Sequence, residues 1–108
     1  MIKGKLDVII IKGDTYEKRI TLTNIDNTTI EGVYVSCEAL GLSQKTTYDN
    51  VNSCYVFRLD TTDTNVLKET TATYDITLKL TNDEVYTLLH KGLLKVIPKV
   101  NEVDYAWW

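Results

Sequence analysis

The sequence predicts an all-β protein, an antiparallel β-sandwich of about seven to eight strands. Its 108 residues include 16 threonines, 10 valines, 9 isoleucines and 7 tyrosines, residue types that favour extended strands. Apolar and polar side chains also alternate along most of the chain, which is the period of a strand with one buried face. We therefore expect one domain over residues 1–98, followed by an aromatic C-terminal tail over residues 99–108.

The alternation places eight candidate strands in order along the chain. An early one puts Lys18 and Ile20 on the inner face and Arg19 on the outer face. In the most regular one, the predicted core face consists of Ala72, Tyr74, Ile76, Leu78 and Leu80. The expected strands span residues 6–12, 15–24, 30–40, 44–49, 52–60, 71–81, 84–90 and 93–98.

Turn-forming residues separate these strands. Pairs that tolerate the positive φ of tight turns are Lys12-Gly13, Asp26-Asn27, Asp49-Asn50, Asn82-Asp83 and Lys91-Gly92. Residues 63–69 have the composition of at most one helical turn, with Asp63 or Thr64 as its N-cap and Val66 and Leu67 facing inward. Pro98 lacks the N–H that a sheet ladder needs, so it should end the last strand.

The charge and the cysteines restrict the classes of partner and compartment. The net charge of -3 and the pI of about 5.0 argue against nucleic acid, which selects clustered Lys and Arg. The apolar run at residues 8–11 is too short for a signal peptide or a membrane span, so we expect cytoplasmic synthesis and no membrane partner.

The two cysteines, Cys37 and Cys54, match no metal-site spacing. They are expected to be buried free thiols, with a disulfide between the two sheets as the alternative.

Nothing in the sequence predicts catalysis. His90 is the single histidine, and its neighbours Leu89 and Lys91 supply no carboxylate to orient it, so it is expected on the surface at a hairpin end. The spacing of the acidic residues in the second half of the chain matches no calcium loop; these are Asp60, Asp63, Glu69 and Asp75. No nucleotide, zinc or redox motif occurs. We therefore expect no enzyme, no cofactor and no metal.

Two aromatic features suggest binding. Flat tyrosine rings stack on sugar faces, and four tyrosines that could point outward are Tyr34, Tyr48, Tyr55 and Tyr86, although strand tyrosines are more often structural. The chain also ends in Tyr105, Trp107 and Trp108, which would expose a large apolar area if nothing covered them. They either fold back on their own domain or bind a neighbouring subunit, and we expect them to bind a partner.

One segment has the spacing of an immunoglobulin-type sandwich. In such domains a tyrosine near the start of the sixth strand stands two residues before an inward position, as Tyr74 stands before Ile76. The alternative is that Tyr74 is an ordinary half-buried strand tyrosine.

Together with residues 12–16, 67–76, 82–89 and 92–96, this pattern resembles the immunoglobulin-like domain of phage baseplate upper proteins and of small tail-associated prophage proteins. The likeness covers residues 12–97 loosely. It departs from the family at Ala72 and at Asp83-Glu84, where a glycine is usual. The resemblance implies a non-enzymatic structural role within a virion. Its partners would be other virion or phage-encoded proteins and further copies of the chain, and the alternative is a host-surface or carbohydrate-binding module.

Overall fold

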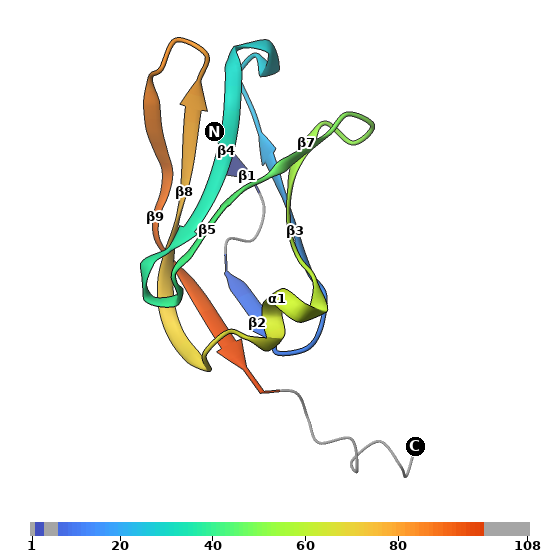
Figure 1. Cartoon of the computed structure of the whole chain (residues 1–108). Coiled ribbons are helices and arrows are strands. Elements are labelled where there is room, and N and C mark those ends of the chain that lie inside the picture. Colours follow the sequence, from blue (N-terminus) through green and yellow to red (C-terminus); the bar gives the residue numbers. More distant parts are fainter. Residues whose placement is uncertain (1, 4–6, 99–108) are drawn as a thin grey trace.

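The structure, a computed structural model, describes residues 2–3 and 7–98. It confirms the all-β sandwich, with two sheets packed face to face (Figure 1). In chain order the strands are β1 (Ile2–Lys3), β2 (Val8–Ile11), β3 (Tyr16–Leu22), β4 (Ile30–Cys37), β5 (Leu42–Lys45), β6 (Thr47–Asp49), β7 (Cys54–Leu59), β8 (Thr70–Leu80) and β9 (Val85–Ile97). The short helices are η1 (Asn27–Thr29), η2 (Glu38–Leu40) and α1 (Thr61–Asn65).

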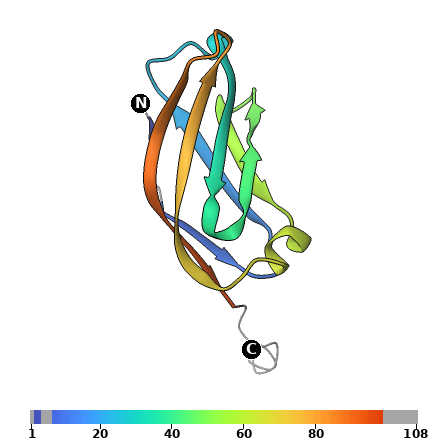
Figure 2. The same cartoon turned by 60° about the vertical axis from the view of Figure 1, so that its left-hand side comes forward.

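The strand order is that of an immunoglobulin-type sandwich. One sheet has the order β1-β3-β7-β6, and the other has the order β2-β9-β8-β4-β5 (Figures 1 and 2). In immunoglobulin nomenclature these correspond to A-B-E-D and to a sheet containing C, F and G. The sandwich is not wholly antiparallel, because β2 pairs parallel to β9 over four residues. The expectation of antiparallel pairing is therefore wrong for this one pair.

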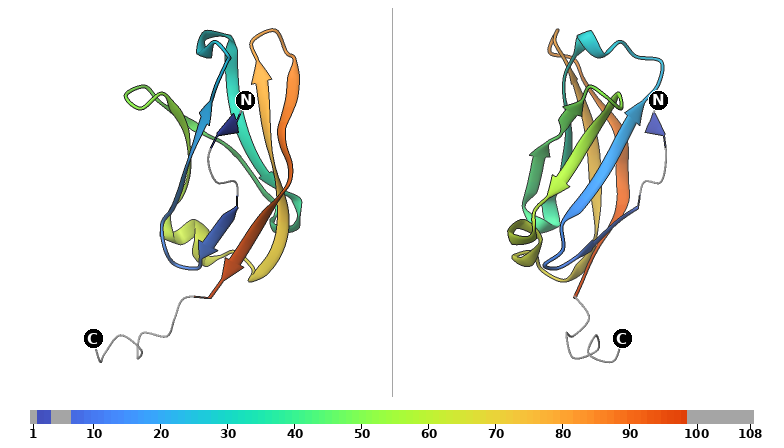
Figure 3. Two further views of the ribbon diagram at one scale, coloured as in Figure 1. Left: turned by 180° about the vertical axis from the view of Figure 1, so that it is seen from behind. Right: turned by 90° about the vertical axis from the view of Figure 1, so that its right-hand side faces the viewer.

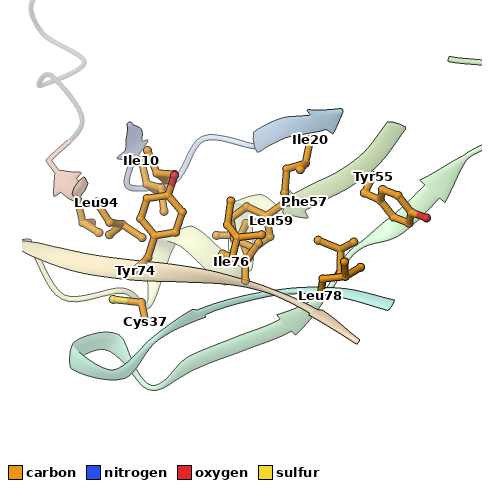
Figure 4. Packing of buried hydrophobic residues seen from close by; sticks show 14 residues of the cluster. Ile10, Ile20, Cys37, Tyr55, Phe57, Leu59, Tyr74, Ile76, Leu78 and Leu94 are labelled. Carbon is orange, nitrogen blue, oxygen red and sulfur yellow. The ribbon is translucent and has the colours of Figure 1, made fainter. Parts of the chain in front are cut away.

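The core consists of the inward side chains of both sheets. Figure 4 shows Ile76 and Leu78 of β8 pointing toward Phe57 and Leu59 of β7. Of the five residues predicted for the core face of β8, three are fully buried and the outermost two, Ala72 and Leu80, pack against the cluster. The alternation pattern thus identified the buried face correctly.

Two strand predictions fail at points where the chain changes sheet or bulges. The predicted strand 44–49 is two strands, because the chain crosses between the sheets at buried Thr46, whose hydroxyl and N–H both donate to Val33 O at 2.8 Å. The predicted strands 84–90 and 93–98 are one strand, β9. The predicted turn at Lys91-Gly92 is instead part of a continuous strand, with a bulge at His90 and Lys91.

Helix α1 begins earlier than expected, with Asp60 as its N-cap, and Asp63 instead accepts a hydrogen bond from the Asp60 backbone N at 3.0 Å. Val66 is exposed, so its predicted inward position is wrong, whereas Leu67 packs against the core as expected. Thr64 is the fully buried residue of this helix.

Both cysteines are buried free thiols, so the disulfide alternative is wrong. The reason is geometric. Cys37 belongs to the core between the sheets (Figure 4). Cys54 lies on the outward side of β7, where its Sγ is 3.7 Å from Nη1 of Arg19. The two thiols therefore face opposite sides of the four-stranded sheet.

Candidate functional site

The outer face of the five-stranded sheet carries exposed apolar side chains along its β2–β9 edge. Ile9 is exposed over 54%, Leu93 over 45% and Ile11 over 37% of its full area, and Ile97 is half-buried beside them. We call these four residues, Ile9, Ile11, Leu93 and Ile97, the apolar stripe. Figure 2 brings this sheet to the front.

Strand register explains why the stripe residues share one face. In the parallel pair, Ile9 lies opposite Lys95 and Ile11 opposite Ile97, while the neighbouring residues Val8 and Ile10 point into the core. Because side chains alternate between faces, residues two apart along β9 join Ile9 and Ile11 on the same outer surface. Exposed Lys95 is the one charged side chain on β9 between Leu93 and Ile97.

The stripe is the element that sequence reasoning missed. The signal was present, because residues 8–11 and 93–94 are unbroken apolar runs instead of alternating ones. In a two-layer sandwich only one face of each strand can enter the core. An unbroken apolar run therefore leaves apolar side chains on the outer face.

A hollow adjoins the stripe over β9, β8, β4 and β5. Its volume is about 540 Å³, and Ser36, Ser43, Thr73, Asp75, His90 and Lys91 are among its lining residues. Thr73 is the register partner of Leu93, so the hollow and the stripe are neighbours on one face.

His90 is on the surface as expected, but it does have a carboxylate partner. The β9 bulge places His90 and Lys91 opposite the single residue Asp75 of β8. Asp75 Oδ1 accepts from the Lys91 backbone N at 2.9 Å and lies 3.1 Å from His90 Nδ1. The pKa of Asp75 is lowered, chiefly by the hydrogen bond from the Lys91 backbone N. The prediction that His90 lacks an orienting carboxylate is therefore wrong, because that carboxylate comes from the adjacent strand.

Two other acidic residues of this region, Asp60 and Asp63, are engaged separately. Asp60 forms an ion pair with Arg58 at 3.4 Å, and Asp63 closes the start of α1. Within the described ranges, His, Cys, Asp and Glu side chains form no group of three or more that could hold a metal ion.

The outer face of the four-stranded sheet is charged, whereas the stripe is apolar. Arg19 pairs with Glu17 at 3.2 Å and with Asp49 at 2.8 Å, and Arg58 pairs with Glu17 at 3.2 Å. Hydrogen bonds from Asn52 and Arg19 lower the pKa of Asp49 to about 2. The strands of this sheet lie in front in the right panel of Figure 3. Their outer face is a network of compensated charges suited to contact with water.

Two of the four candidate sugar-binding tyrosines lie together. The rings of Tyr48 and Tyr55 are 4.9 Å apart, and Asn27 Nδ2 donates to the Tyr48 hydroxyl at 2.9 Å. They line a hollow of about 320 Å³ with Glu31 and Lys45. Tyr55 is buried, which corrects its outward placement, whereas Tyr34 is half-buried and Tyr86 is exposed at the far end of β9.

Tyr74 is fully buried rather than half-buried (Figure 4). Burial raises its pKa to about 12. Its role as the corner tyrosine of an immunoglobulin-type domain stays a prediction.

The predicted partner-binding residues Tyr105, Trp107 and Trp108 lie outside the described residues. Among residues 2–3 and 7–98, no helix has the length and apolar character needed to cross a membrane. No protein-family model matches this chain, and comparison with curated protein sequences finds no match.

Proposed function

We propose that this chain is a non-enzymatic assembly domain that docks on other proteins through the outer face of its five-stranded sheet. The observation that carries the proposal is the apolar stripe, because exposed Ile9, Ile11 and Leu93 lie on the same outer face of two neighbouring strands instead of scattered over the surface. Grouped exposed apolar side chains are typical of protein–protein contact sites.

The contrast between the two sheets supports this choice of face. The four-stranded sheet presents ion pairs such as Arg19–Asp49, which are already satisfied and would have to be desolvated on docking. Removing the stripe from water instead lowers the free energy, because its side chains are apolar. Docking on the five-stranded sheet is therefore the favourable arrangement.

The resemblance to baseplate and tail-associated domains suggests where such assembly takes place. On this proposal the partners are virion proteins of a phage or prophage, including further copies of the chain, and the tail residues Tyr105, Trp107 and Trp108 supply aromatic anchors.

The test combines light scattering with capture of partner proteins. The full chain is measured over a range of concentrations, and it is then used to capture purified proteins encoded by the genes that flank its own. Leu93→Asp should weaken both self-association and capture by about tenfold or more. Val51→Asp is the matched control, since Val51 is 90% exposed but lies in the turn between β6 and β7. A wild-type chain that neither self-associates nor captures any of these proteins contradicts the proposal.

A second candidate function is carbohydrate binding at the Tyr48–Tyr55 hollow. An aromatic pair beside an amide and the charged groups of Glu31 and Lys45 provides both stacking and hydrogen bonding for a sugar ring. A glycan array probed with wild type and with Tyr48→Ala tests it. Binding by wild type that is lost in Tyr48→Ala would support this function, and no binding by wild type would remove it.

A further inference from the structure

We infer that the apolar stripe of one chain receives the C-terminal aromatic segment, residues 99–108, of a second copy, so that two copies exchange tails across a two-fold interface. This inference rests on the proposed assembly function and names the partner. Its first support is position. The stripe ends at Ile97, the last residue of β9, and the tail follows directly after Pro98.

The tail sequence complements the stripe in pattern. Val103, Tyr105 and Trp107 alternate with Glu102, Asp104 and Ala106, which is the two-residue period of a strand with one apolar side. The stripe is likewise formed by alternate residues of neighbouring strands. An extended tail laid along it would set apolar side chains against Ile9, Leu93 and Ile97.

The charges are complementary as well. Exposed Lys95 lies among the stripe residues, and the tail carries Glu102 and Asp104 between its apolar residues. In an extended tail these two carboxylates project from the face opposite Val103, Tyr105 and Trp107, so they attract Lys95 without contacting it and favour orientation more than affinity.

The buried area favours a mutual exchange. Tyr105 and Trp107, which share the apolar side of the tail, bury roughly 150–250 Å² each. Two exchanged tails would therefore contribute roughly 600–1,000 Å², and the stripe side of each contact brings the total into the range of stable interfaces. A two-fold axis uses the same patch on both copies and leaves no stripe uncovered.

Return of the tail to its own stripe is less favourable. The chain would have to reverse direction after Pro98, where β-branched Val100 disfavours positive φ and Asn101 is the first residue type that commonly adopts it. Continuing straight to a second copy avoids the reversal.

Tryptophan fluorescence tests this inference directly, because Trp107 and Trp108 are the two tryptophans of the chain and both lie in the tail. In the full-length protein, emission should move to shorter wavelength as concentration rises, in step with the mass measured by light scattering. Leu93→Asp should keep the emission of water-exposed tryptophan and raise the dissociation constant by about tenfold or more. Val51→Asp should match wild type. Circular dichroism confirms that each variant is folded.

Mixing two variants distinguishes exchange from return to the same chain. Chains with residues 99–108 deleted keep an intact stripe, and Leu93→Asp chains keep an intact tail. Each alone should be monomeric, whereas the mixture should form a heterodimer. Lys95→Glu should also weaken the dimer, and Glu102→Lys with Asp104→Lys should restore it in that background.

Each contrary result has a defined meaning. Shifted emission that does not depend on concentration, in a monomeric wild type, overturns exchange in favour of return to the same chain. A dimer that survives Leu93→Asp places the tail elsewhere. In both cases the inference fails, while the proposed function stands if partner capture is observed. A wild type that neither self-associates nor captures a partner removes both.

Discussion

Gly92 is the residue whose identity is most tightly set by its neighbours. A Cβ at this position would lie 2.6 Å from Leu89 Cδ2 and 2.8 Å from Cε1 of the buried Tyr74 ring. We expect Gly92→Ala to lower the free energy of unfolding by about 1–3 kcal/mol, because the added methyl group would force the buried ring to shift. Urea unfolding measures this loss. Thr87→Ala, an exposed position of β9, is the control and should change stability by less than about 0.5 kcal/mol.

Tyr74 gives the protein a predictable response to alkaline pH. Burial raises the pKa of Tyr74 from 10.0 to about 12, so the folded state keeps a proton that the unfolded chain releases earlier. Its contribution to stability is fully present below about pH 10 and is lost as pH rises through about 12. The free energy of unfolding, measured by urea titration at each pH, should therefore fall across this window. A Tyr74→Phe variant with an equally steep fall would show that another group is responsible.

Helix α1 is held to the rest of the fold by one hydroxyl group. The buried Oγ1 of Thr64 accepts from the Gly13 backbone N at 3.0 Å and donates to the Asp14 backbone O at 2.8 Å. Thr64→Val keeps the shape but leaves both backbone groups without this partner, so we expect a loss of about 1–3 kcal/mol. Thermal or urea unfolding should show it, and Thr62→Val, an exposed position of the same helix, should show little change.

The β9 bulge depends on Asp75. Its carboxylate accepts from the Lys91 backbone N at the point where two residues of β9 face one of β8. We expect Asp75→Ala to increase hydrogen exchange at the Lys91 amide, since the bulge then lacks its acceptor. Asp75→Asn keeps an acceptor oxygen and should retain much of the protection. Equal exchange in wild type and Asp75→Ala would mean that backbone pairing alone holds the bulge.

The strands differ in how well the sequence predicts them. Alternation identified the buried face of β8 because that face depends only on the two-residue period of a strand. It predicted a turn at Lys91-Gly92 in place of the bulge at His90 and Lys91, because a turn and a bulge both use positive φ, and Lys91 has a φ of 58°. It also did not separate β5 from β6, because the change of sheet at Thr46 depends on pairing with distant strands.

At the scale of the whole molecule, β2 contributes side chains both to the core and to the outer face of the sheet. Ile10 is fully buried in the core, whereas its neighbour Ile9 lies in the apolar stripe. Ile10→Ala should lower the free energy of unfolding by about 2–5 kcal/mol. Ile9→Ala should change it by less than about 0.5 kcal/mol at concentrations where the chain is monomeric. Equal losses in chemical denaturation would contradict this division of β2 between core and outer surface.

The candidate site was less predictable than the core. The aromatic tail stood out in the sequence because Trp107 and Trp108 follow a polar stretch, but the stripe needs the register of β2 against β9 to become visible. That register is a long-range parallel pairing between the beginning and the end of the sandwich. No local period of the sequence encodes it.

This parallel pairing also determines how the domain would carry load. Tension between the N-terminal end of β2 and the C-terminal end of β9 pulls two parallel neighbours in opposite directions along their length. All four register pairs, from Val8–Leu94 to Ile11–Ile97, are then loaded in shear together rather than opened one by one. An anchored chain pulled at its tail would therefore resist extension at this pair of strands, which makes the domain mechanically suited to a place in a strained assembly.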